Sequence, residues 1–159
     1  MTKRVYLIAE VLCVAALLAF IIVLCTARSG GTQKDIKEVA APIAEAVEEV
    51  TLQEKTNADI VKTFGFDTAD TAGASYYASD NVMVVSEILL VKLNDPSDAP
   101  AVQEAIEKYV VNQENLYKNY APEQYSLLTD SIIEVSGNTV FYCTAKNADE
   151  LYEIFRKAL

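Results

Sequence analysis

Residues 82–93, VMVVSEILLVKL, form the most apolar run after the N-terminal segment, and they decide the fold of what surrounds them. Val, Ile and Leu dominate the run, while polar residues bound it at 79–81 (SDN) and 94–96 (NDP). A run of this composition between turn-forming residues predicts a largely buried strand. We therefore expect the rest of the soluble part to be assembled around this stretch.

Strand and helix patterns flank this run on both sides. Further strands are predicted at 51–54, 74–78, 131–135 and 139–145, and the last two form a hairpin through Gly137. Apolar residues at helical spacing predict a helix at 57–64, a long helix whose apolar face runs from Val102 to Tyr120, and a C-terminal helix capped by Asn147. The predicted fold is α+β, with a small, mostly antiparallel sheet of about four strands. The long helix and the C-terminal helix are expected to cover it.

An apolar segment near the N-terminus predicts membrane insertion. Residues 5–25 follow Lys3 and Arg4 and are long enough for the ~20 residues that span a bilayer. The preceding positive charges predict a cytoplasmic N-terminus and an extracytoplasmic C-terminal domain, in a single-pass protein of the cell membrane. We favour an uncleaved anchor; a signal peptide cut after Ala27 and a lipoprotein modified at Cys25 are alternatives. Glu10, inside the span, either reaches the interface or pairs with a partner helix.

Three regions follow from this pattern: an anchor or signal segment at 1–27, a linker and stalk helix at 28–50, and an extracytoplasmic α+β domain at 51–159. Within the second region, an apolar stripe from Ile36 to Val50 has helical spacing, but Pro42 interrupts it. Because proline is tolerated in the first turn of a helix and disfavours helix before it, the helix is expected to begin near Pro42. Its stripe packs on the domain or, less ordinarily, on a partner helix.

Composition excludes several classes of function. There are 23 acidic and 13 basic residues, a net charge of −10, so a nucleic-acid partner is not expected. The sequence has no His, and its Asp-containing turn at 67–73 lacks the spacing of a calcium loop, so no metal site and no cofactor are expected. Of the three cysteines only Cys143 follows the apolar segment, which leaves no disulfide within the domain; we expect this thiol to be buried.

A set of landmarks in fixed order gives the chain a family resemblance from about residue 51 to its end. These landmarks are Gly65-Phe66-Asp67 with Asp70, Tyr76-Tyr77, residues 83–92 with Glu87, Gln113, Tyr120-Ala121-Pro122 and Gly137. In them the chain resembles the bacterial family called domain of unknown function 4358, secreted or membrane-anchored proteins of Gram-positive clostridia and their relatives. The resemblance implies an extracytoplasmic α+β domain behind an anchor, and it implies no activity, ligand or catalytic residue. Leu24 before Cys25 departs from a lipoprotein signal.

Glu87 is the sharpest candidate for a site. Strand alternation places it on the same side as Val85, Leu89 and Val91, so the carboxyl group lies on an apolar row. A carboxyl group there must be hydrogen-bonded, paired or protonated. Either loop N–H groups or tyrosine hydroxyls satisfy it as part of the architecture, or it contacts a ligand.

Three further side chains complete the candidate polar site: Tyr76, Gln113 and Tyr120. Tyr120 also belongs to a group of tyrosines in one region, with Tyr109, Tyr117 and Tyr125. Such tyrosines ordinarily contribute the ring to a core and the hydroxyl to water, and a carbohydrate- or peptide-binding surface is the alternative.

No assembled catalytic set is recognisable, so the chain is not expected to be an enzyme. We expect a membrane-tethered, non-catalytic module that binds a protein or another component of the envelope. A carboxylate-based hydrolase is one alternative; it requires Glu87 and Asp80, or another acid, about 5 to 10 Å apart in an open cleft. A structural spacer is the other, and it predicts no sizeable exposed apolar patch.

Overall fold

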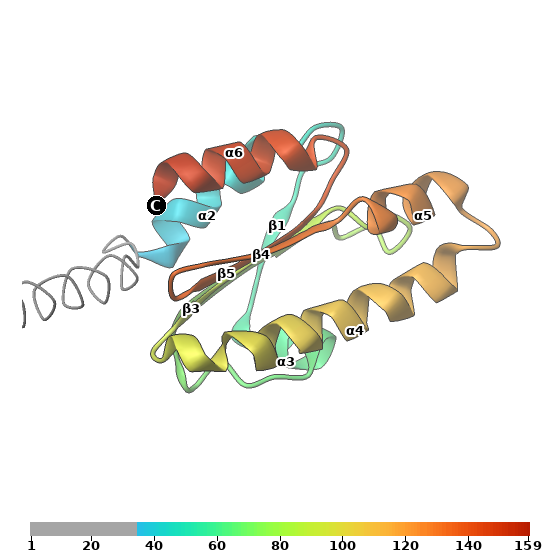
Figure 1. Cartoon of the computed structure of the whole chain (residues 1–159). Helices are drawn as coiled ribbons and strands as arrows, with labels where there is room; N and C mark the ends of the chain where they lie inside the picture. Colours follow the sequence, from blue (N-terminus) through green and yellow to red (C-terminus); the bar gives the residue numbers. More distant parts are fainter. Residues whose placement is uncertain (1–34) are drawn as a thin grey trace, which may run out of the picture. The chain divides into compact units, whose positions relative to one another are not determined.

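A five-stranded antiparallel sheet is the middle layer of the computed structural model, which describes residues 35–159 (Figure 1). The strands are β1 (Gln53–Lys55), β2 (Thr71–Ala78), β3 (Glu87–Leu93), β4 (Ile132–Ser136) and β5 (Thr139–Thr144). Their spatial order is β1-β2-β3-β5-β4, and every neighbouring pair is antiparallel. The α+β class and the antiparallel sheet are confirmed, and the apolar stretch supplies the central strand.

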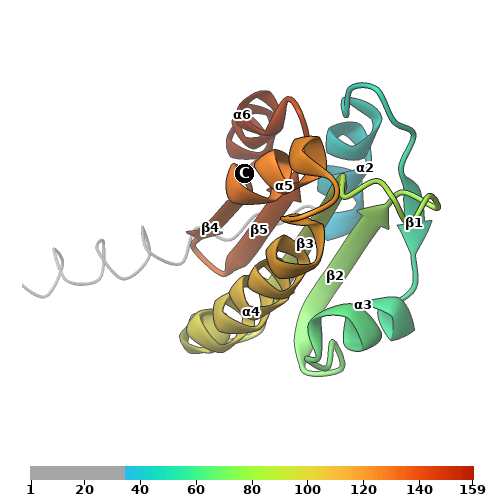
Figure 2. The same ribbon diagram turned by 90° about the vertical axis from the view of Figure 1, so that its right-hand side faces the viewer.

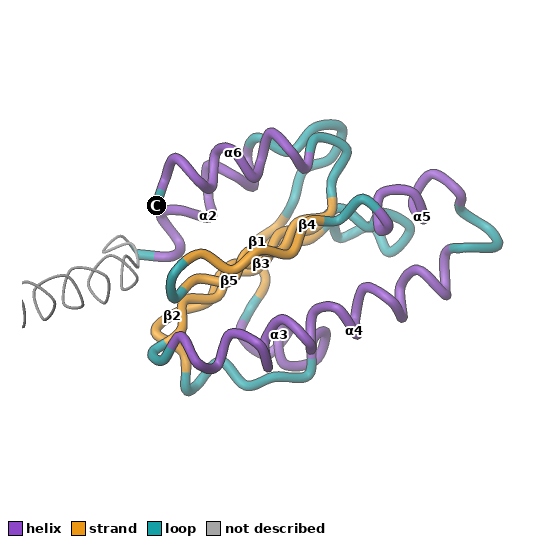
Figure 3. The backbone as a smooth tube through the Cα atoms, viewed as in Figure 1, coloured by secondary structure: helices purple, strands orange, loops and turns teal. Residues whose placement is uncertain are grey.

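Helices cover both faces of this sheet (Figure 3). On one face lie α2 (Ile36–Glu45) and α6 (Ala148–Ala158), and on the other lie α3 (Asn57–Phe64) and α4 (Ala99–Tyr117). Figure 2 shows the same three layers in the turned view, with α2 and α6 above the strands and α3 and α4 below. A short 3-10 helix, η1 (Pro96–Asp98), leads into α4, and α5 (Pro122–Thr129) follows it. The long helix and the C-terminal helix cover the sheet as predicted, on opposite faces.

The central strand is shorter than its composition predicts. β3 begins at Glu87, and the preceding residues form a turn in which Asn81 accepts the Met83 N–H with its side chain and the Val84 N–H with its carbonyl. Val82 is consequently 84% exposed. Asn81 competes for these backbone groups and ends the extended conformation, although the apolar pattern continues through it.

Helix α2 begins earlier than predicted and contains Pro42 in its interior. Asp35 caps it by accepting the Lys37 N–H, which fixes the start of the helix at Ile36, ahead of the proline. Pro42 and Glu38 are both exposed, so the carbonyl that lacks an N–H partner at Pro42 faces water. The buried residues of the stripe, among them Ile36 and Ile43, pack on the sheet. The segment expected to be linker and stalk thus contributes a helix to the core of the domain.

Asn147 is the N-cap residue of α6, as predicted, but its side chain does not act as the cap. Its side chain makes no capping hydrogen bond; instead Nδ2 donates to the Ala46 carbonyl (3.0 Å) and Oδ1 accepts the Glu48 N–H (3.3 Å). These bonds join the start of α6 to the end of α2, residues about a hundred positions apart in the sequence. The Asn147 side chain therefore makes tertiary hydrogen bonds in place of the capping bond that the local sequence predicts.

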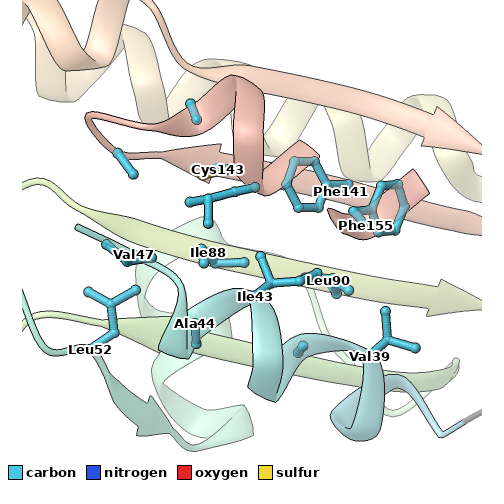
Figure 4. Close-up of a cluster of buried hydrophobic side chains, with 14 of the residues drawn as sticks. Val39, Ile43, Ala44, Val47, Leu52, Ile88, Leu90, Phe141, Cys143 and Phe155 are labelled. Atoms are coloured by element: carbon cyan, nitrogen blue, oxygen red, sulfur yellow. The ribbon is translucent and has the colours of Figure 1, made fainter. Parts of the chain in front are cut away.

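The face beneath α2 and α6 is packed mainly with apolar side chains (Figure 4), and Ser75 of β2 is also buried there, opposite Leu90. Ile88 and Leu90 of β3 and Phe141 and Cys143 of β5 are fully buried there. Phe155 of α6 stacks on Phe141 with ring centroids 4.5 Å apart. Cys143 is a free thiol, and burial raises its pKa, so the prediction of a buried cysteine is confirmed.

The predicted membrane segment, residues 5–25, lies outside the residues that the structure describes, as do Glu10, Cys25 and Ala27. From residue 35 to the C-terminus, none of the helices combines the length and the apolar character that crossing a membrane requires.

Candidate functional site: a buried carboxyl group among tyrosines

Glu87 opens the central strand and faces the α3 and α4 side of the sheet. It is 4% exposed and belongs to the same row as Leu89 and Val91, as strand alternation predicts. Its direct neighbours across the sheet are Ala78 of β2 and Thr144 of β5. Small neighbours on both sides leave room above the carboxyl group for larger side chains from the next positions.

Two tyrosines fill that room and bond to the carboxyl group. Tyr76 of β2 donates its O–H to Oε2 of Glu87, and Tyr142 of β5 donates to Oε1, each at 2.7 Å. Both tyrosines pair with Leu89, so each reaches Glu87 diagonally from an adjacent strand. The Thr144 hydroxyl donates in turn to the Tyr142 oxygen at 2.9 Å. Each carboxyl oxygen thus has one phenol donor.

Aromatic rings from both helices enclose this cluster. The ring of Phe64, at the end of α3, lies edge-on to Tyr76, Tyr109 and Tyr142, with centroids 5.3, 4.7 and 5.9 Å away. Tyr109 comes from α4, and its hydroxyl acts on Glu87 by lowering the pKa of the carboxyl group. The carboxyl group is therefore shielded from water by rings that also supply its donors.

Burial and hydrogen bonding act on the carboxyl group in opposite directions. Burial raises the pKa of Glu87, and the hydroxyls of Tyr76, Tyr142 and Tyr109 oppose this by stabilising the carboxylate. The pKa of each of these tyrosines is raised, first by burial and then by the nearby Glu87 charge. The phenols consequently remain protonated donors at neutral pH.

This geometry counts against the carboxylate-based hydrolase. Such an enzyme needs two acids in an open cleft, whereas Glu87 is closed off by packing. Asp80, the proposed second acid, is exposed and forms an ion pair with Lys55 at the surface. Within residues 35–159 no group of three or more His, Cys, Asp or Glu side chains is placed to hold a metal ion.

The predicted site residues separate into two places. Tyr76 joins Glu87, but Gln113 and Tyr120 are not among the groups that bond to it. Gln113 is half-buried on α4, and Tyr120 is 57% exposed in the turn that follows this helix, where its ring packs on Tyr117. The buried cluster therefore does not extend to that turn.

Sequence reasoning did not include Tyr142 and Tyr109 in the cluster. Strand alternation within 139–145 places Tyr142 and Thr144 on one side, which was the available signal. What was missing is the pairing of β3 with β5, because these strands are separated by η1, α4, α5 and β4. Strand alternation could identify Tyr142 as a candidate partner for Glu87. It could not predict the strand order that brings the two residues together.

A second feature is an exposed apolar group that we call the Val82 patch, formed by Val82, Met83 and Tyr120. Val82 and Met83 are 84% and 51% exposed in the turn between β2 and β3. Tyr117 links them to Tyr120: its hydroxyl donates to the Val82 carbonyl at 2.6 Å, and its ring centroid is 5.3 Å from that of Tyr120. The patch thus combines two segments far apart in the sequence.

Comparison with known protein families matches residues 44–145 to the family described as Domain of unknown function (DUF4358). The chain belongs to this family. The match runs from within α2 to the end of β5, so it includes the whole sheet and every member of the Glu87 cluster. No curated protein and no solved structure matches the chain.

Proposed function

We propose that this member of the DUF4358 family is a membrane-tethered, extracytoplasmic module that binds an envelope protein and is not an enzyme. The observation that carries the proposal is the Val82 patch, which displays large apolar side chains on a turn held in place by the fold. Exposed apolar groups that add nothing to the core are typical of interaction sites.

The turn that carries the patch is fixed by hydrogen bonds. Besides the bond from Tyr117, the Val85 N–H donates to the Gln124 side chain of α5 at 2.9 Å. Met83 and Val84 donate to Asn81 within the turn. A surface that is already ordered loses little conformational entropy on binding, and this favours association.

Charge defines the kind of partner. Residues 35–159 include 22 acidic and 9 basic side chains, a formal net charge of −13. A partner with an apolar contact surrounded by Lys or Arg would be drawn to such a domain and oriented on it.

The tether rests on the sequence of residues 5–25 and on the positive charges before it. Protease treatment of intact cells and of inverted membrane vesicles tests this part: residues 35–159 are expected to be digested only from the outer side. Digestion only in inverted vesicles would overturn the orientation.

Site-specific photo-crosslinking in the native envelope tests the binding surface. A photoreactive residue at position 83 is expected to give one discrete adduct, which is lost when Tyr120 is replaced by Ser. The matched control is the same photoreactive residue at Asp149, an exposed position on α6. An identical set of adducts from both positions, or none from position 83, would contradict the proposal.

A further inference from the structure

We infer that the outer edge of β4 accepts an extended protein segment that carries a Lys or Arg between β-branched residues, which would add a sixth strand to the sheet. β4 is the last strand in the order β1-β2-β3-β5-β4, so one of its two edges pairs with β5 and, within residues 35–159, no strand pairs with the other. The helices α4 and α6 pack on the two faces of the sheet (Figure 2).

The geometry of the hairpin determines which backbone N–H and C=O groups point outward at this edge. β4 and β5 are joined by the two residues Gly137 and Asn138, so the flanking pair, Ser136 and Thr139, is hydrogen-bonded. Hydrogen-bonded and non-bonded pairs alternate along an antiparallel ladder. The N–H and C=O groups of Ile133 and Val135 therefore point away from β5, and they offer four hydrogen bonds to an added strand.

The two edges of the sheet differ in how they are protected. β1, at the other edge, has three residues, all polar, and a short polar strand of this kind resists pairing with other chains. β4 has the sequence IIEVS, pairs with β5 without a bulge, and includes neither Pro nor Lys. Ile132, Ile133 and Val135 are only half-buried. An added strand would cover the remaining apolar area.

The charge of Glu134 determines which kind of segment can pair with this edge. Glu134 is exposed in the middle of β4, and the described residues provide no ion-pair partner for it. If a second copy paired with β4 over all five residues, Glu134 would oppose its own counterpart in a close, non-hydrogen-bonded pair. Like charges in that position destabilise a sheet, and opposite charges stabilise it. A heterologous strand with a basic residue opposite Glu134 fits, as does the net charge of −13.

Binding of synthetic peptides to the full-length protein in detergent micelles tests this inference. The probe is Val-Thr-Val-Lys-Val-Thr-Val, and the matched control replaces its Lys by Glu. The Lys peptide is expected to bind about tenfold more tightly than the Glu peptide by fluorescence anisotropy. Methylation of the amide nitrogens of the two Val residues beside Lys is expected to abolish binding, because those N–H groups face β4.

A charge reversal in the protein gives the complementary test. Glu134→Lys is expected to reverse the preference between the two peptides, whereas Glu123→Lys, on the exposed surface of α5, is expected to leave it unchanged. Hydrogen exchange of the Ile133 and Val135 amides is expected to slow by at least tenfold when the Lys peptide is bound.

Three results would overturn the inference. The first is equal affinity for the two peptides, and the second is amide protection elsewhere than β4. The third is protection of Ile133 and Val135 that rises with protein concentration alone, because that result would make a second copy the occupant. None of these measurements involves the Val82 patch, so the proposed function stands or fails separately.

Discussion

The two faces of the central sheet reach nearly complete burial by different means. Beneath α2 and α6 the sheet presents mainly apolar side chains, among them Ile88, Leu90 and Phe141, and none of the described charged groups is buried there. Beneath α3 and α4 the same strands bury Glu87, with tyrosine hydroxyls aimed at both of its oxygens. The first face depends mainly on filled volume, and the second depends also on the hydrogen bonds to a buried carboxyl group.

This difference arises because β3 contributes side chains to both faces of the sheet. Successive residues of β3 alternate between the faces, so Glu87 and Ile88 are adjacent in sequence yet belong to separate clusters. A defect on the apolar face leaves a cavity, whereas a defect on the other face leaves a buried donor or charge without a partner. Substitutions on the two faces are therefore expected to differ in size and in their dependence on pH.

Phe155→Ala is expected to have the largest effect, because it tests the apolar face by volume alone. Phe155 is fully buried and stacked on Phe141, so its loss is expected to lower the free energy of unfolding by about 3–5 kcal/mol. Urea unfolding followed by far-ultraviolet circular dichroism measures this. Tyr152→Ala, at a half-buried neighbour on α6, is the control and should cost less. Equal losses would show that α6 is not packed as described.

Glu87→Ala tests the polar face and is expected to cost roughly 2–3 kcal/mol. Two buried phenol donors lose their acceptors, but the variant no longer buries a carboxyl group, which reduces the loss. The same urea titration measures it, and Glu104→Ala, an exposed position on α4, should change the free energy of unfolding by less than about 0.5 kcal/mol. A stabilised Glu87→Ala variant would mean that the cluster serves a purpose other than stability.

Tyrosine-to-phenylalanine substitutions are expected to rank the two donors. Tyr142→Phe removes one donor to Glu87 and also the acceptor of the fully buried Thr144 hydroxyl, whereas Tyr76→Phe removes a donor to Glu87 and an interaction with the half-buried Thr63 side chain. Each is expected to cost about 1–3 kcal/mol, with Tyr142→Phe the more costly. Differential scanning calorimetry at one pH compares them. The reverse order would contradict the chain of bonds from Thr144 through Tyr142 to Glu87.

The last expected effect, small for each pH unit, is a dependence on pH confined to the Glu87 face. Because burial raises the pKa of Glu87, the folded protein holds this proton more tightly than the unfolded chain. The resulting stability is fully present below the unfolded pKa of about 4.3 and is lost as the pH rises through the folded pKa. Relative to Glu87→Gln, the wild type should lose at most about 1.4 kcal/mol per pH unit over that window.

Paired urea titrations of the wild type and Glu87→Gln between pH 4.5 and 8 measure this difference. The sequence has no His, so no imidazole titrates in the same range. Parallel curves for the two proteins would show that Glu87 keeps one protonation state throughout. Phe155→Ala, from the apolar face, should follow the pH dependence of the wild type.

Much of the fold could be predicted from local patterns. The hairpin of β4 and β5, the pairing of β2 with β3 and the long covering helix all follow from period, turn residues and composition. The predicted starts of β3 and α2 were wrong because hydrogen bonds from a single side chain outweighed the apolar pattern of the sequence. Asn81 ended the apolar run before β3, and Asp35 started α2 despite Pro42.

The candidate site could be predicted in part for a different reason. Glu87 stands out because alternation places a charge on an apolar row, and tyrosine hydroxyls were one of the expected solutions. Which tyrosines supply them depends on strand order and register, and these are set by packing between distant segments. Tyr76 lies on the adjacent hairpin strand, whereas Tyr142 and Tyr109 become neighbours of Glu87 only once the sheet and α4 have assembled.

Cys143 allows the rate at which the apolar face opens to be measured. It is the sole cysteine between residues 35 and 159, and it sits fully buried on β5 directly opposite Ile88 of β3. Because only an accessible thiolate reacts readily with alkylating reagents, the folded domain protects this sulfur on two counts, burial and a raised pKa. Each modification at Cys143 therefore reports an opening of the centre of the sheet. The rate of modification measures how often such openings occur under native conditions.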